Sequence, residues 1–202
     1  MNVHAVGDVL LILGAAGVGK STIGRHCALR WPAKRYVDVG TVREVLRSEH
    51  PDLRHSTYAV WRLAGDAYSP ITLAQGWEQY VAVMWPAVVR ILENTAREEN
   101  NLVMDGAMLS PRLIADLKLE RLRVHPRMLC LSDADEHFHR MRGSVRAGSP
   151  QEARLVESFP RVRALQEYLE RECRAHDIPI IENVSLEDSL AQILASLPRT
   201  VA

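Results

Sequence analysis

A glycine-rich segment near the start of the chain holds the residues best suited to chemistry. Its sequence, Gly14-Ala-Ala-Gly-Val-Gly19-Lys20-Ser21, fits the pattern G-x-x-x-x-G-K-[ST]. Glycines at these positions let backbone N–H groups turn inward around a phosphate chain, at the positive end of a helix dipole. Lys20 can reach the β- and γ-phosphates as a catalytic group, and the Ser21 hydroxyl can bind Mg²⁺. We therefore expect a nucleoside triphosphate to bind to Gly14, Ala15, Ala16, Gly17, Val18, Gly19, Lys20, Ser21 and Thr22.

Two aspartates follow apolar segments and could act on the same phosphates. Asp105 ends the apolar run "NLVMD", where an acid from a neighbouring strand could hold the Mg²⁺ shell. Asp38 lies in "RYVDV" and could accept a proton from a substrate hydroxyl or hold a metal-bound water. Each also fits a structural role, because aspartates commonly cap the turn or helix that follows a strand.

Arginines gather late in the chain, at positions 140, 142, 146, 154, 161 and 163. Phosphoryl transfer needs positively charged groups that neutralise the equatorial oxygens of the transferred group, and a site that excludes water. A mobile pair of arginine-bearing helices between the fourth and fifth predicted strands, forming a lid over about residues 136–163, would supply both. We expect Arg142 and Arg146 to be catalytic, and at least half of the cluster to be an ordinary solvated helix face.

The elements that must position these residues alternate along the chain. Short apolar runs predict strands at 8–13, 35–39, 101–106, 127–133 and 178–183. Helical spacing predicts helices at 20–30, 41–50, 56–67, 75–97 and 186–197, and a helical stretch over 136–177. This order favours an α/β fold in one domain, 1–202, with a five-stranded parallel sheet flanked by helices.

The composition excludes several other classes of protein. The 25 basic and 25 acidic residues cancel, so the chain lacks the charge of a general nucleic-acid binder. No apolar stretch approaches the ~20 residues of a membrane span, and the first residues lack the pattern of a signal peptide. Three separated cysteines without a CxxC motif predict a reducing, cytoplasmic location. No N-K-x-D motif occurs, so GTPases match poorly; an oligomer is possible but not indicated.

Several segments together resemble the 2-phosphoglycerate kinase family of P-loop kinases. They are "GAAGVGKST", "TVREVLR", "STYAVW", "MDGAMLSP" and "FPRVRALQEYL…IPIIENVS", and the resemblance covers residues 10–197. It implies a P-loop NTPase fold similar to nucleotide-monophosphate kinases, with a five-stranded parallel sheet and an arginine-bearing lid. It also implies ATP-dependent phosphorylation of a hydroxyl on a small phosphorylated acid.

The resemblance implies roles for residues outside the glycine-rich segment. Next to the acceptor substrate it places Arg43, Arg47, Ser56, Tyr58 and Trp61, and it directs Arg161 and Arg163 toward the phosphates. A planar guanidinium suits a carboxylate or phosphate through paired N–H donors. Near the nucleotide it places Arg140, Asn183 and Val184, the last two through backbone contacts with the adenine.

Two departures from the family pattern lie on the acceptor side. Gly40 stands where the family carries an acid, with Asp38 two residues earlier, and Met108 stands where the family carries a histidine after Asp105-Gly106. These changes suggest an altered acceptor beside an unchanged phosphate-donor site.

The leading hypothesis is thus an ATP- and Mg²⁺-dependent kinase of a small, anionic, 2-phosphoglycerate-like metabolite. Alternative acceptors are a hydroxylated natural product or sugar, or the 5′-hydroxyl of a polynucleotide. The neutral charge and the lack of an aromatic-basic stripe count against the polynucleotide. A nucleotide-binding regulator without enzymatic activity is the remaining alternative.

Overall fold

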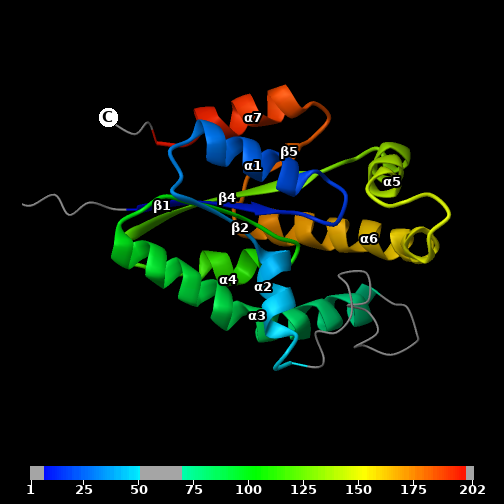
Figure 1. Cartoon of the computed structure of the whole chain (residues 1–202), viewed down its shortest axis with the longest axis horizontal. Coiled ribbons are helices and arrows are strands. Elements are labelled where there is room, and N and C mark those ends of the chain that lie inside the picture. The colour runs from blue at the N-terminus through cyan, green and yellow to red at the C-terminus, as the bar shows by residue number, and fades with distance from the viewer. Residues whose placement is uncertain (1–6, 51–69, 199–202) are drawn as a thin grey trace, which may run out of the picture.

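A five-stranded parallel sheet forms the centre of the molecule (Figure 1). The computed structural model describes residues 7–50 and 70–198. In sheet order the strands are β2 (Arg35–Asp38), β3 (Leu102–Asp105), β1 (Gly7–Leu13), β4 (Leu122–Cys130) and β5 (Ile180–Glu182). Every pairing is parallel, which confirms the predicted α/β fold.

Helices cover both faces of the sheet. On one face lie α1 (Lys20–Arg30) and α7 (Leu186–Ala195); on the other lie α3 (Pro70–Glu98), α4 (Pro111–Ala115) and α6 (Pro150–Ala175) (Figure 1). The remaining helices, α2 (Val39–Leu46) and α5 (Ala134–Gly143), lie toward the end where the strands finish (Figure 1). The carboxyl ends of the strands and these two helices therefore surround the same region, where open α/β sheets bind ligands.

The central strand is the most deeply buried part of the core. Residues Val9 to Leu13 of β1 are completely shielded from solvent, because β3 and β4 pair with β1 on both sides and helices cover both faces. A strand in this position reads as a continuous apolar run, as "VLLIL" does. Among the described residues, none of the helices is long and apolar enough to cross a membrane.

Some element boundaries differ from the sequence-based prediction. β2 ends at Asp38 and α2 begins at Val39, because the Asp38 side chain accepts a hydrogen bond from the Gly40 N–H and caps α2. The helical stretch 136–177 contains the expected helix pair, α5 and α6, and α5 begins two residues earlier than predicted, at Ala134. The five-residue α4 was not predicted; Ser110 caps it and Pro111 opens it. The predicted helix 56–67 lies outside the described residues, as do Ser56, Tyr58 and Trp61.

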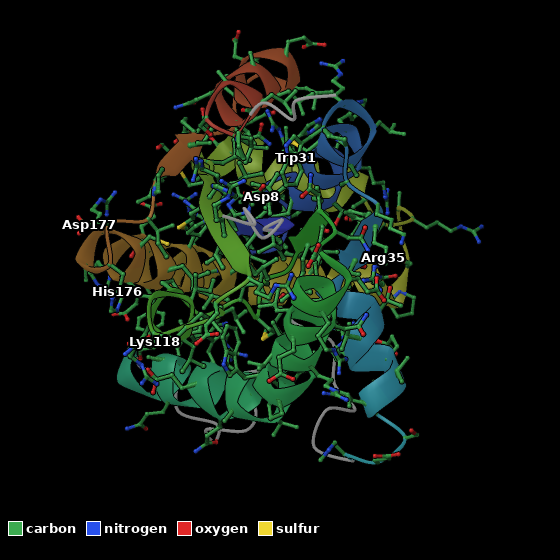
Figure 2. The ribbon with its side chains drawn as sticks, turned by 90° about the vertical axis from the view of Figure 1, so that its left-hand side faces the viewer. Asp8, Trp31, Arg35, Lys118, His176 and Asp177 are labelled. Atoms are coloured by element: carbon green, nitrogen blue, oxygen red, sulfur yellow. The ribbon has the colours of Figure 1, made fainter. Side chains whose placement is uncertain are left out.

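The opposite end of the sheet, where the strands begin, holds a polar cluster around the buried carboxylate of Asp8. Figure 2 faces this end and shows Asp8 near its middle, with Trp31 and Arg35 on neighbouring elements. Arg123 donates to both carboxylate oxygens of Asp8, at 2.8 and 2.7 Å, and His125 Nε2 lies 2.7 Å from Asp8 Oδ1. These contacts join β1 to β4 far from the glycine-rich segment.

Candidate active site

The glycine-rich segment forms a tight loop between β1 and α1, as predicted. Gly17 and Gly19 adopt positive φ angles of 83° and 90°, a region that side chains other than glycine rarely occupy. Neighbouring side chains also exclude a Cβ at both positions: it would overlap Met141 at Gly17 and Asn183 at Gly19. Both the backbone conformation and the packing therefore require glycine here.

Lys20 opens α1 and folds back over the loop, where its Nζ donates to the Ala15 carbonyl at 2.7 Å. Burial lowers the pKa of Lys20, and the nearby carboxylates of Asp105 and Asp38 oppose that shift. The Lys20 ammonium thus lies close to the loop backbone and to the carboxylates of Asp105 and Asp38.

Asp105 lies at the carboxyl end of β3 and is 1% exposed. Its Oδ2 accepts a hydrogen bond from the Ser21 hydroxyl at 2.9 Å, and its Oδ1 accepts one from the Tyr36 hydroxyl. Burial raises the pKa of Asp105, although Tyr36, Lys20 and Ser21 each act to lower it. A hydroxyl and a carboxylate in contact are the hard oxygen donors that Mg²⁺ prefers, so this pair fits the predicted metal site.

Asp38 is the register partner of Asp105 on the adjacent strand β2. Its Oδ1 accepts from the Gly40 N–H at 2.8 Å, so the predicted capping role is present. The same residue also lines a cavity together with Lys20 and Arg43, so its side chain faces a space that could hold a small ligand. The Asp38 carboxylate can therefore cap α2 with one oxygen and face the cavity at the same time.

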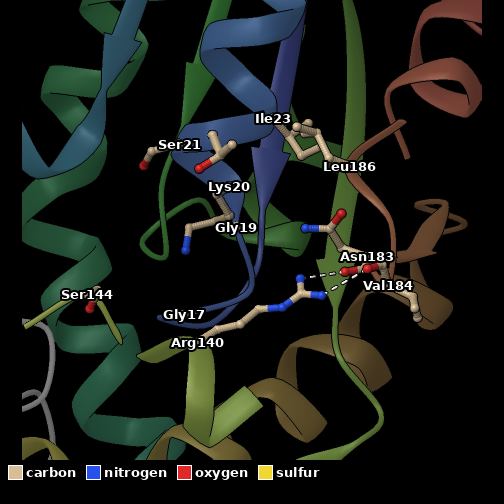
Figure 3. Close-up of a pocket in the computed structure, with 11 residues that line it drawn as sticks. Gly17, Gly19, Lys20, Ser21, Ile23, Arg140, Ser144, Asn183, Val184 and Leu186 are labelled. Atoms are coloured by element: carbon tan, nitrogen blue, oxygen red, sulfur yellow. Dashed lines mark hydrogen bonds between the residues drawn. The ribbon is translucent and has the colours of Figure 1, made fainter. Parts of the chain in front are cut away.

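Two cavities flank the N-terminus of α1. The larger, of about 410 Å³, is shown in Figure 3 and is lined by loop glycines, Arg140, Asn183, Val184 and Leu186. The smaller, of about 130 Å³, is lined by Asp38, Arg43, Asp105 and Met108 among others. Lys20 and Ser21 line both cavities, so the lysine and the serine stand at their junction.

Arg140 reaches from α5 to the loop that follows β5. Its guanidinium donates to the carbonyl oxygens of Asn183 at 2.7 Å and Val184 at 2.9 Å, as the dashed lines in Figure 3 show. Its Nε donates to Glu136 at 2.6 Å. The structure thus brings together, at one wall of the larger cavity, the three residues predicted for the nucleotide outside the glycine-rich segment.

The other lid arginines are placed in different ways. Arg142 pairs with Glu152, whose second oxygen accepts from the Gly148 N–H. Arg146 is exposed in the connection between α5 and α6. Arg163 donates to the carbonyls of Leu131 and Ser132 and lies 3.3 Å from His137 Nδ1, while Arg161 is half-buried on α6. Arg163 therefore contacts residues behind the cavities and does not line either cavity.

On the acceptor side, Arg43 and Arg47 both pair with Glu44, at 2.8 and 2.6 Å. Arg43 lines the smaller cavity, and so do the two positions that depart from the family pattern, Gly40 and Met108.

Sequence reasoning missed several residues that the structure places in or behind the site. They are Tyr36, Val39, Ala107, His137, Ser144 and Leu186. Tyr36 lies two residues before Asp38 on the same side of the strand, which is the one local signal that could have found it. Val39 and Ala107 adjoin the predicted Asp38 and Asp105-Gly106 in sequence, whereas His137, Ser144 and Leu186 reach the site from distant parts of the chain.

Comparison with known proteins shows which proteins this chain resembles. The chain is 30% identical to a 2-phosphoglycerate kinase of Thermococcus kodakarensis, over 93% of this chain and 65% of that protein. It is 26% identical to a 2-phosphoglycerate kinase of Methanocaldococcus jannaschii, over 92% of this chain and 62% of that protein. The chain thus spans less than two thirds of these relatives' length. No family model matches it.

A solved shikimate kinase from Bacteroides thetaiotaomicron superposes with a TM-score of 0.51 at 15% identity, covering 94% of this chain and 98% of that chain. At this identity the likeness concerns the fold alone. The comparisons therefore confirm that the chain resembles 2-phosphoglycerate kinases along almost its whole length and has the fold of a P-loop kinase.

Proposed function

We propose that this protein is an ATP- and Mg²⁺-dependent kinase that phosphorylates a hydroxyl group of a small anionic metabolite. The observation that carries the proposal is the pair of cavities that meet at Lys20 and Ser21. A phosphoryl group in transfer must lie between a donor and an acceptor, and it needs a cation beside it throughout. The junction offers that arrangement with Lys20 as the shared cation.

In this proposal ATP occupies the larger cavity. Loop N–H groups and Lys20 hold the phosphates, and Arg140, Asn183 and Val184 lie on the wall assigned to the base. Ser21 and Asp105 would hold Mg²⁺, which neutralises charge on the β- and γ-phosphate oxygens when bound.

The acceptor occupies the smaller cavity. Its hydroxyl oxygen forms a bond to the γ-phosphorus, the bond from that phosphorus to the β–γ bridging oxygen breaks, and ADP leaves. Asp38 orients the hydroxyl and takes its proton, and Arg43 attracts the anionic group of the acceptor. Ser56, Tyr58 and Arg47 remain predicted substrate residues. Arg161 and Arg163 also remain predicted substrate residues, on the side of the phosphates.

The relatives are named 2-phosphoglycerate kinases, which makes 2-phosphoglycerate the first acceptor to test. Gly40 and Met108 favour a second candidate, a hydroxylated natural product or sugar. Both positions line the cavity assigned to the acceptor, and both lack the polar side chain that the family pattern has there. A cytoplasmic location, as the cysteines predict, is part of the proposal.

The test is incubation with Mg-ATP and 2-phosphoglycerate, 3-phosphoglycerate or glycerate, followed by phosphorus NMR. A new phosphate ester that disappears in the Lys20→Ala variant is the expected result. If nucleotide binds but none of the three compounds is phosphorylated, the anionic-acceptor proposal fails and a panel of sugars and hydroxylated natural products tests the second candidate. If nucleotide does not bind at all, both candidates fail.

A further inference from the structure

Side chains hold three carbonyl groups of the phosphate-binding loop. The Ala15 carbonyl accepts from Lys20 Nζ at 2.7 Å, and the Val18 carbonyl accepts from Asn183 Nδ2 at 2.8 Å. The Ala16 carbonyl lies 2.6 Å from His137 Nε2, a contact across 121 residues of sequence. His137 lies on α5 and is not one of the predicted site residues.

The orientation of the Ala16 carbonyl decides the direction of the next N–H group. A peptide unit is planar and trans, so its C=O and N–H point to opposite sides. Turning the Ala16 carbonyl toward His137 therefore turns the Gly17 N–H the other way, away from α5. N–H groups directed inward are what a loop of this kind offers to phosphate oxygens.

The contacts of His137 define its protonation state. A carbonyl only accepts, so Nε2 must carry the hydrogen in the contact with Ala16. Arg163 Nη1 only donates, so Nδ1, at 3.3 Å, must accept. Both ring nitrogens are thus used in the neutral form, which agrees with the pKa of His137, lowered by burial.

The ring is also fixed by packing. His137 is completely buried, and Phe159 of α6 packs against it edge to face, with ring centroids 5.4 Å apart. Gly17 lies so close that a Cβ there would come within 3.2 Å of the imidazole. Arg163, also on α6, donates to the carbonyls of Leu131 and Ser132, which directly follow β4, and it also contacts the ring. The imidazole thus has one orientation relative to the loop.

We infer that His137 is a positioning residue, which holds the Ala16–Gly17 peptide in the orientation that binds the nucleotide phosphates. The inference rests on the proposed nucleotide site. It assigns Arg163 the role of orienting His137, so that α5 and α6 support the loop from outside. It also predicts that loss of His137 weakens binding of the phosphates beyond the first, which the loop encloses, and does not weaken binding of the nucleoside.

The experiment measures dissociation constants of ADP and AMP, without any acceptor, for the unmodified chain and the variants His137→Leu, His137→Gln and His139→Leu. His139 is exposed on the same helix and is the matched control. We expect His137→Leu to weaken ADP about ten-fold, the value of one lost hydrogen bond, and AMP by less than about two-fold. His137→Gln retains a donor at the Nε2 position and should bind ADP within about three-fold of the unmodified chain.

Equal losses for ADP and AMP, or unchanged ADP binding in His137→Leu, would overturn the inference. If His137→Leu does not fold, His137→Asn replaces it, because its shorter amide does not reach Ala16. The His137→Gln variant must then bind ADP several-fold more tightly than the His137→Asn variant, and equal affinities would contradict the assignment. An unmodified chain that binds no ADP would overturn the proposed function itself, which separates the two failures.

Discussion

The Ser21 hydroxyl donates a 2.9 Å hydrogen bond to Asp105 Oδ2 and so joins the first turn of α1 to the end of β3. β3 pairs with β1, and the partner of Asp105 across this ladder is Ile12, shortly before the loop begins. The sheet register therefore fixes the acid next to the loop serine. The two oxygen atoms are close enough for both side chains to contact the same cation.

The first prediction concerns this pair. Asp105→Asn keeps the size of the side chain but removes the charge, so Mg²⁺-dependent phosphoryl transfer should fall by about 100-fold. Steady-state turnover over a Mg²⁺ titration measures the effect, with exposed Asp116→Asn as the control. Turnover equal to that of the unmodified chain at every Mg²⁺ concentration would remove Asp105 from the metal site.

The second prediction separates the two roles of Asp38. Asparagine caps helices as well as aspartate does, whereas alanine does not. Asp38→Asn should therefore keep the stability of the protein while lowering kcat by about 100-fold or more, as expected for loss of a proton acceptor. Asp38→Ala should show the same kinetic loss and also destabilise the protein by about 1 kcal/mol. An Asp38→Asn variant with normal kcat would leave Asp38 as a helix cap alone.

The sequence predicted the parts of the site that depend on local order. β1 is a continuous apolar run, and the glycine-rich segment and Pro32 delimit α1, whose predicted bounds agree with the structure. The boundary between β2 and α2 was placed too late because "RYVDV" reads as one extended run. Only the hydrogen bond from Gly40 to Asp38 shows that the helix has already begun.

Contacts between distant segments could not be predicted from the sequence. Arg140 and Asn183 are 43 residues apart, and His137 and Ala16 are 121 apart. An arginine or histidine on a predicted helix carries no local signal that it will donate to a backbone carbonyl elsewhere. Arg163 shows the consequence: the family resemblance directs it toward the phosphates, whereas it donates hydrogen bonds to the backbone carbonyls of Leu131 and Ser132.

The third prediction concerns pH. Burial lowers the pKa of His137 below its usual 6.5, and the cations facing it from α6, α1 and α5 (Arg163, Lys20 and Arg140) act in the same direction. The folded state thus binds a proton less readily than the unfolded state. Stability from this group is complete above about pH 6.5 and is lost as pH falls through the folded-state pKa. The free energy of unfolding, measured with denaturant from pH 8 to 5, should decrease less in His137→Gln than in the unmodified chain. Equal decreases in the two proteins would contradict this prediction.

The fourth prediction concerns the end of the sheet where the strands begin. Burial acts to raise the pKa of Asp8, but hydrogen bonds from Arg123 and His125 outweigh it, so the net pKa lies below the usual value. Asp8→Asn removes the charge that both partners face and should lower the free energy of unfolding by about 1–3 kcal/mol. ADP affinity should stay within about two-fold, because the cluster lies at the far end of β1 from the loop. A large loss of affinity without loss of stability would show that this reasoning is wrong.

The fifth prediction concerns the lid arginines. Arg142 is paired with Glu152, which also accepts from Gly148 and so holds the connection between α5 and α6. Arg146 is exposed in that connection, and no ion pair to it occurs within residues 7–50 and 70–198. A guanidinium there is available to approach the transferred group, so Arg146→Ala should lower kcat by about 100-fold or more while ADP affinity changes little. Arg142→Ala should act mainly through the order of the connection and cost less.

Arg154→Ala is the matched control for Arg146→Ala, since Arg154 is an exposed arginine near the start of α6. Single-turnover measurements at saturating ATP separate the chemical step from product release, which the lid could also govern. A rate loss in Arg146→Ala that vanishes under single-turnover conditions would assign Arg146 to opening of the lid. Equal rates for the Arg146 and Arg154 variants in both assays would place Arg146 with the solvated arginines of the helix face.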